Sequence, residues 1–182
     1  ARFAAALKAA NPKVILPVFR QRASDRATNL DLVDSLPAEP FLSHVDLAGL
    51  NIFPTDDGKV RELFVETVVD GRDFPTLSVL LAGSDGMPYD SFAIDFSIDP
   101  ATVPRLSYAD VAQGLFPPDA VARKQVVVGS TAAELGDFVA VPGRRALPGP
   151  LVHILGYESI VQGRALQRLS SLPVTVLAVL LV

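Results

Sequence analysis

The sequence predicts an α/β domain built on a mixed β-sheet with flanking helices. Two observations support this fold class: helix-like and strand-like segments alternate along the chain, and 182 residues suffice for one domain with a sizeable core. The hydrophobic share of 49% is high for a globular chain, and the charged share of 20% is low. We expect a single sensory domain over residues 1–168, followed at residues 172–182 by the start of a transmembrane helix.

The first elements are a helix, a strand and a loop. Residues 1–10 have the spacing of an amphipathic helix, which Asn11-Pro12 ends. The apolar run at residues 14–19 predicts a strand, in which Pro17 requires a position near the strand end or at a sheet edge. Residues 20–40 are rich in charge and contain prolines, so they predict an exposed loop with a short helical turn at most.

A hairpin and a second turn follow. Residues 49–53 and 60–65 predict two strands joined by a turn at Thr55-Asp56-Asp57-Gly58, because glycine adopts positive φ without a steric clash. Asp70-Gly71-Arg72 predicts the second turn. We read Asp56 and Asp57 as turn residues, since a calcium loop needs about five or six oxygen ligands.

The middle of the chain predicts two short helices and a strand between them. Residues 75–82 form a helix that Pro75 opens and Gly83 closes. Residues 92–98 alternate apolar and polar, as a half-buried strand does. Ser107 caps a second short helix, which ends at Gly114.

The last third predicts a central strand and the longest helix. Residues 125–128 are the run richest in β-branched residues, and residues 148–163 carry a mainly apolar stripe at helical spacing. The uncharged run at 172–182 is expected to begin a membrane span, which needs roughly 20 apolar residues. A buried terminal helix is the alternative. We expect the chain to be a piece of a longer protein, truncated at both ends.

Charge and composition exclude several classes of function. The net charge of −4 and the lack of a basic run argue against nucleic-acid binding. The chain has no cysteine, and its two histidines, His44 and His153, lie far apart in the sequence. We therefore expect no metal site and no cofactor.

Three blocks, in order, resemble the CHASE domain of the second type. They are Gly49 to Glu62 with its Asp-Asp-Gly turn, Pro104 to Gly114 with its Pro-Arg-Leu-Ser-Tyr-Ala-Asp-Val run, and Lys124 to His153 with its Gly-Ser-Thr and Pro-Gly residues. The resemblance covers about residues 1–166. Two departures stand out: Arg123 occupies a position where the family usually has glycine, and Pro150 one where a branched apolar residue is usual.

The resemblance implies an extracytoplasmic, signal-sensing domain of a bacterial membrane protein. Such domains lie on the N-terminal side of nucleotide cyclases, diguanylate cyclases and histidine kinases, so this fragment would not itself be an enzyme. The expected partners are an unknown small-molecule signal, the cell membrane through the C-terminal segment, and a second copy in a homodimer. Two alternatives remain: a serine hydrolase using Ser130 and His153, and a dimerisation module that binds no ligand.

A ligand pocket is expected around Ser130, Thr131, Arg144 and His153. In open α/β sheets ligands lie beyond the carboxyl ends of strands, where Ser130 and Thr131 would leave the strand at 125–128. Arg144, with Arg145, could neutralise a carboxylate or phosphate, so we predict a small anion. The alternatives are a plain turn at Ser130, a hydrogen-bonded structural His153 and solvated loop arginines.

Overall fold

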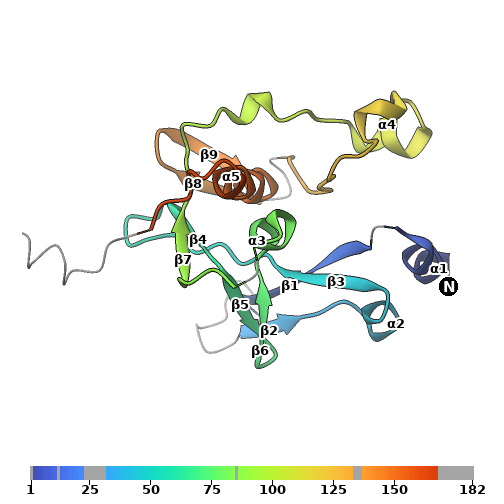
Figure 1. The fold of residues 1–182 in the computed structure, drawn as a ribbon, viewed down its shortest axis with the longest axis horizontal. Helices are drawn as coiled ribbons and strands as arrows, with labels where there is room; N and C mark the ends of the chain where they lie inside the picture. Colours follow the sequence, from blue (N-terminus) through green and yellow to red (C-terminus); the bar gives the residue numbers. More distant parts are fainter. Residues whose placement is uncertain (1, 12, 23–31, 85, 133–136, 168–182) are drawn as a thin grey trace, which may run out of the picture.

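The computed structural model describes residues 2–11, 13–22, 32–84, 86–132 and 137–167. Its architecture is mixed α/β, which agrees with the predicted class (Figure 1). The described strands form four small sheets, however, and not one large mixed sheet. The predicted membrane segment at 172–182 lies outside the described residues. Within the described ranges, no helix combines the length and apolar character needed to cross a membrane.

The N-terminal part is a three-stranded mixed sheet flanked by two short helices. Its elements are α1 (Arg2–Ala9), β1 (Val14–Arg22), β2 (Leu32–Ser35), α2 (Glu39–Leu42) and β3 (Val45–Gly49). Strand β1 pairs in parallel with β3 from Val14 to Val18 and antiparallel with β2 from Phe19 to Arg22. Pro17 therefore lies in the part of β1 that has β3 as its neighbour. Its nitrogen, which has no hydrogen to donate, can face the side of β1 that has no partner strand. The prediction of a loop over residues 20–40 is wrong for β2. An ion pair between Arg20 of β1 and Asp34 of β2 joins the two strands.

A tight hairpin comes next in the fold. It consists of β5 (Glu66–Val69) and β6 (Arg72–Pro75), joined by Asp70 and Gly71. Both linking residues have positive φ, 52° and 68°, as a type I′ turn requires. The second predicted turn is thus confirmed, and it closes a hairpin that the sequence analysis did not assign.

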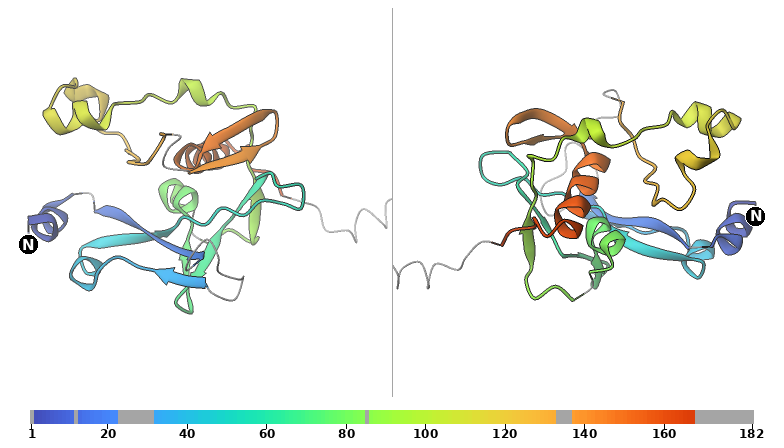
Figure 2. Two further views of the ribbon diagram at one scale, coloured as in Figure 1. Left: turned by 180° about the vertical axis from the view of Figure 1, so that it is seen from behind. Right: turned by 45° about the horizontal axis from the view of Figure 1, so that its top comes forward.

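The main core lies between α5 and the strands that precede it in sequence. The elements around it are β4 (Glu62–Phe64), α3 (Leu77–Ala82), β7 (Ser91–Ala93), β8 (Phe138–Val141), β9 (Arg144–Pro148) and α5 (Gly149–Val161). Strand β4 pairs with β7, and β8 pairs with β9. The side chains of Leu63, Phe92 and Leu155 are among the largest that are fully buried. Helices α3 and α5 pack against each other near the middle of the molecule (Figure 2).

A long excursion separates β7 from β8. It contains a 3₁₀ turn at Pro100–Thr102, helix α4 (Tyr108–Gln113) and a second 3₁₀ turn at Pro118–Ala120. Ser107 Oγ accepts the backbone N–H of Ala109, and Gly114 ends α4 in a left-handed conformation, as predicted. In the views of Figures 1 and 2, α4 projects away from the core.

Two strand predictions are wrong, and a third, for residues 92–98, holds only for the short β7, which ends at Ala93. Residues 125–128 form no strand, and Val126 and Val128 are exposed, so the β-branched run is not a central strand. Residues 49–53 and 60–65 do not pair as a hairpin either. The turn at residues 55–58 forms, but β4 takes β7 as its partner and the N–H of Val60 bonds to Ala140.

Candidate functional site

Helix α5 carries His153 and lies beside the segment of Ser130 and Thr131. It begins after Pro148 with Gly149 and Pro150, which suits a first helical turn because proline supplies no N–H there. The N–H of Gly149 donates to the carbonyl of Asp137 at 2.9 Å. A Cβ at position 149 would lie 2.5 Å from Asp137 Oδ1, so the approach of this carboxylate to the helix start requires glycine.

Ser130 and Thr131 lie beside this first turn, although no strand precedes them. A Cβ at Gly129 would collide with Cγ of Pro150, which shows how closely the segment passes the helix. Ser130 Oγ is shielded from solvent and has no hydrogen-bond partner among the described residues. Thr131 is exposed. The prediction that Ser130 and Thr131 follow a central strand is wrong. The unpartnered hydroxyl of Ser130 lies near the first turn of α5 instead.

His153 lies one turn into α5 and is buried, with 3% of its surface exposed. Its Nε2 lies 3.3 Å from the carbonyl oxygen of Leu50, so a neutral imidazole would carry its proton on Nε2. Nδ1 is then a buried acceptor without a partner in the described structure. Burial lowers the pKa of His153 to about 4, and the bond to Leu50 opposes this shift only in part.

Arg144 lies on β9, in a region predicted to be a loop. Residues 138–148 instead form the β8–β9 hairpin, which turns at Pro142 and Gly143, and this corrects the expected loop from 142 to 150. The Arg144 guanidinium lies 3.5 Å from Asp99 Oδ1, in an ion pair between partly exposed side chains. Such a pair is weak, so the guanidinium could exchange Asp99 for another anion at small cost.

The four residues therefore divide into two groups. The segment of Ser130 and Thr131 lies against the first turn of α5, and His153 is one turn further along the same helix. Arg144 is tied to Asp99. Two surface hollows lie elsewhere, one around Phe3 and Phe41 and the other at the turn of residues 55–58.

The geometry does not form the triad that the hydrolase alternative needs. Among the residues that the structure describes, Ser130 Oγ has no hydrogen-bond partner, and the one bond of the His153 ring goes to a backbone carbonyl. The Asp137 carboxylate packs against Gly149. A serine nucleophile requires a base within hydrogen-bond reach and an acid that orients this base, and neither contact is present among the described side chains.

The turn at residues 55–58 is locked by its own side chains. Arg61 donates two hydrogen bonds to the Asp57 carboxylate, at 2.6 and 2.7 Å, and a third to Thr55 Oγ1. These bonds hold the pKa of the Asp57 carboxyl well below its usual range. The reading of Asp57 as a turn residue agrees with this geometry, and the described residues contain no acidic or histidine cluster suited to a metal.

A buried polar seam between α3 and α5 was missed by sequence reasoning. Ser78 Oγ donates to the carbonyl of His153 at 2.8 Å, and Ser159 Oγ donates to the carbonyl of Leu155 and accepts the N–H of Asp95. A Cβ at Gly156 would lie 2.7 Å from Ser78 Oγ. The available signal was the small-residue spacing on α5, where Gly156 and Ser159 lie one turn apart and allow close helix packing.

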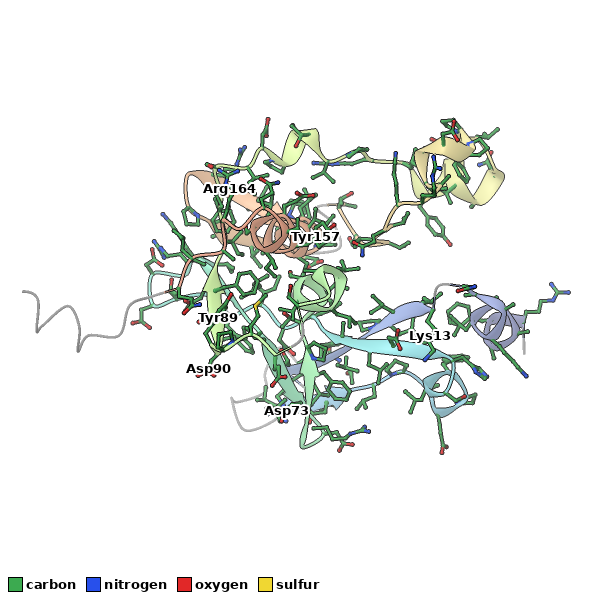
Figure 3. All side chains as sticks on the ribbon, viewed as in Figure 1. Lys13, Asp73, Tyr89, Asp90, Tyr157 and Arg164 are labelled. Carbon is green, nitrogen blue, oxygen red and sulfur yellow. The ribbon has the colours of Figure 1, made fainter. Side chains whose placement is uncertain are left out.

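The residues that follow α5 are fastened to the strands of the core. Arg164, which Figure 3 labels just beyond the helix, pairs with the Asp95 carboxylate and donates to Ser97 Oγ at 2.9 Å. The N–H of Ala93 in β7 donates to the carbonyl of Leu166 at 2.8 Å. The chain therefore leaves the domain along a fixed path beside β7.

A comparison with protein families identifies the whole chain. The model described as the CHASE2 domain matches residues 1–182. No curated protein and no solved structure matches the chain. CHASE2 domains are extracytoplasmic sensory domains and not catalytic ones. Since the match extends from the first residue to the last, the chain belongs to the CHASE2 family of extracytoplasmic sensory domains.

Proposed function

We propose that this domain is the signal-input part of a membrane-bound bacterial signalling protein, such as a nucleotide cyclase, a diguanylate cyclase or a histidine kinase. Membership of the CHASE2 family is the observation that carries this proposal. The uncharged run at residues 172–182 supports attachment to a membrane, because its composition suits the hydrocarbon core. The output enzyme would then lie on the other side of that membrane.

Helix α5 is the proposed route of the signal. It packs on α3, and two of its apolar side chains, Val152 and Leu155, belong to the main core. Its C-terminal end continues into Arg164 and Leu166, which are held by Asp95 and Ala93. A ligand that favours a second position of α5 would have to shift this exit segment, since a packed core has discrete and not continuous arrangements.

We place the ligand beside the first turn of α5, around Ser130, Thr131, Arg144 and His153, and propose a small anion. Support comes from the solvent-shielded Ser130 hydroxyl, which lacks a partner, and from the partly exposed Arg144, whose present pair is weak. The N-terminus of a helix as long as α5 also favours negative charge nearby, and because the Asp137 carboxylate already lies beside Gly149, the ligand would bind on the side of Ser130 and Arg144. His153 would contribute by position, because its neutral ring holds Leu50 against α5.

Thermal unfolding in the presence of small carboxylates and inorganic phosphate tests the ligand. We expect one of them to raise the unfolding temperature of the 182-residue chain, and Arg144→Ala with Arg145→Ala to abolish the increase. Arg72→Ala is the matched control, because Arg72 is an exposed arginine on the separate β5–β6 hairpin. An increase that survives the double substitution would place the ligand elsewhere.

Signalling is tested in the full-length protein reconstituted in vesicles. The expected result is that Arg164→Ala changes the turnover of the output enzyme while the domain stays folded, because the fixed exit path is lost. A full-length sequence without a membrane span or output enzyme would refute the signalling role. That outcome would leave anion binding to be judged by the thermal experiment alone.

A further inference from the structure

The excursion between β7 and β8 is an arm without a core of its own. We define the arm as residues 104–129, and no residue in it is buried. Several of its apolar side chains face solvent: Tyr108 is 78% exposed and Leu115 is 65% exposed, and Leu106 and Val111 are also exposed. Such a concentration of exposed apolar side chains on one element marks a surface that binds another protein.

Helix α4 shows that the arm needs a packing partner. It is well capped, by Ser107 at one end and Gly114 at the other, but it has only six residues. Isolated helices shorter than about 12 residues are marginal in water, and most helical stability in proteins comes from packing an apolar face. Within the described chain, the arm makes two hydrogen bonds to other elements, from Gln125 Nε2 to the carbonyl of Leu81 and from Arg105 Nη2 to the carbonyl of Pro100.

An apolar groove lies in the N-terminal part of the same chain. It has a volume of about 330 Å³, and its walls come from α1, β1 and the β2–α2 connection. The aromatic and aliphatic side chains that line it are Phe3, Leu16, Pro17, Phe19, Leu36 and Phe41. Phe3 and Phe41 meet edge to face at one side, with ring centroids 5.2 Å apart. In Figures 1 and 2, α1, α2 and α4 all lie at the end of the molecule opposite residues 162–167.

We propose that the arm of one chain occupies the groove of a second copy, in a two-fold dimer with reciprocal arms. Each chain carries an unfilled apolar groove and an unpacked apolar arm. A two-fold axis places the arm of each chain in the groove of the other, so both grooves are filled and both arms are packed. The length of the arm agrees with the roughly 20–30 residues a side of a standard interface.

The position of the two surfaces sets the symmetry of the dimer. Both lie at one end of the molecule, and the segment after α5 leaves from the other end. A two-fold axis parallel to the long axis of the molecule therefore sends both C-terminal segments in the same direction. The exchange of arms does not depend on any ligand or output enzyme.

Cysteine crosslinking tests the exchange, because the native chain has no cysteine. Ala112 is exposed on α4, and Ala38 is exposed on the groove wall. When the single variants Ala112→Cys and Ala38→Cys are mixed and oxidised, we expect a mixed disulfide dimer. Ala146→Cys, on exposed β9, replaces Ala112→Cys in the control mixture and should give far less product.

Light scattering of the 182-residue chain gives the second measurement. We expect a dimer that Leu115→Asp weakens by at least about tenfold, while far-ultraviolet circular dichroism stays unchanged because the arm lies outside the core. A chain that is monomeric at every concentration overturns the proposal. It is also overturned if the Ala38→Cys, Ala112→Cys double variant forms only an intramolecular disulfide, since the arm would then close on its own groove.

Discussion

The buried imidazole of His153 should make the stability of the domain depend on pH in a defined window. In the unfolded chain the group takes a proton below its ordinary pKa of 6.5, whereas in the folded domain burial holds the pKa at about 4. Between these values the unfolded state binds more protons than the folded state. The free energy of unfolding therefore falls as the pH is lowered, by up to about 1.4 kcal/mol for each pH unit.

The magnitude follows from the size of the shift. From pH 7 to pH 4.5, His153 alone should remove about 2.5 kcal/mol from the free energy of unfolding, and the loss should level off below pH 4. This is a large fraction of the roughly 5–15 kcal/mol that stabilises a typical domain. Carboxylates with lowered pKa, such as Asp95 beside Ser97, add their own losses at lower pH.

Urea unfolding of three proteins at pH 7 and pH 4.5 isolates the contribution of His153. His153→Gln keeps a donor for the Leu50 carbonyl but cannot titrate, so its stability should fall by about 2.5 kcal/mol less than that of the native chain. His44→Gln removes the other histidine and serves as the matched control, which should follow the native protein. If native protein and His153→Gln lose the same free energy, the imidazole is not a buried neutral group and the reasoning is refuted.

Three further substitutions test packing, the arm and the exit segment. Gly156→Val places a branched side chain against Ser78 and should cost about 2 kcal/mol in urea unfolding; an unchanged midpoint would contradict the close packing of α3 and α5. Ser107→Ala removes the cap of α4, yet at monomer concentrations it should alter global stability by less than about 0.5 kcal/mol, and a larger loss would show that the arm belongs to the core. Arg164→Ala should lower the free energy of unfolding by less than about 1 kcal/mol but speed amide exchange at Ala93. Unchanged exchange at Ala93 would show that the ion pair does not support the strand contact there.

Local chemistry predicted the turns, the caps and the long helix of this fold. Asp70 and Gly71 form the turn that their conformational preferences favour, and Gly83 closes α3 as expected. The strand partners were not predictable in this way. Strand β4 pairs with residues 91–93 and not with the nearer run at 49–53, because the pairing is decided by which faces meet in the core. The run at 125–128 failed for the same reason, since no strand of the described chain pairs with it and Val126 and Val128 stay exposed.

The candidate site shows the same division between local and long-range information. The bond from Arg61 to Asp57 spans four residues and lay within reach of sequence reasoning, whereas the bond from Ser78 to His153 joins residues 75 apart. Arg123 is a different case. It stands where the family usually has glycine, and its φ of 58° is the left-handed conformation that glycine adopts without strain. The glycine that the family usually has at this position indicates a left-handed backbone conformation, which an arginine in the sequence does not indicate.

The late position of α5 in the sequence has a consequence for folding during synthesis. Of the core elements, the ribosome delivers β4 first and α5 last, and the core cannot close before α5 arrives with Val152 and Leu155. At about 5–20 residues per second, the delay from β4 to the end of α5 is on the order of 5–20 seconds. During this time the apolar faces of the strands have no cover, and an extracytoplasmic chain must pass through this stage while it is being exported. We expect chains that stop short of Gly149 to be recognised as unfolded by chaperones and proteases, while chains that include Val161 fold.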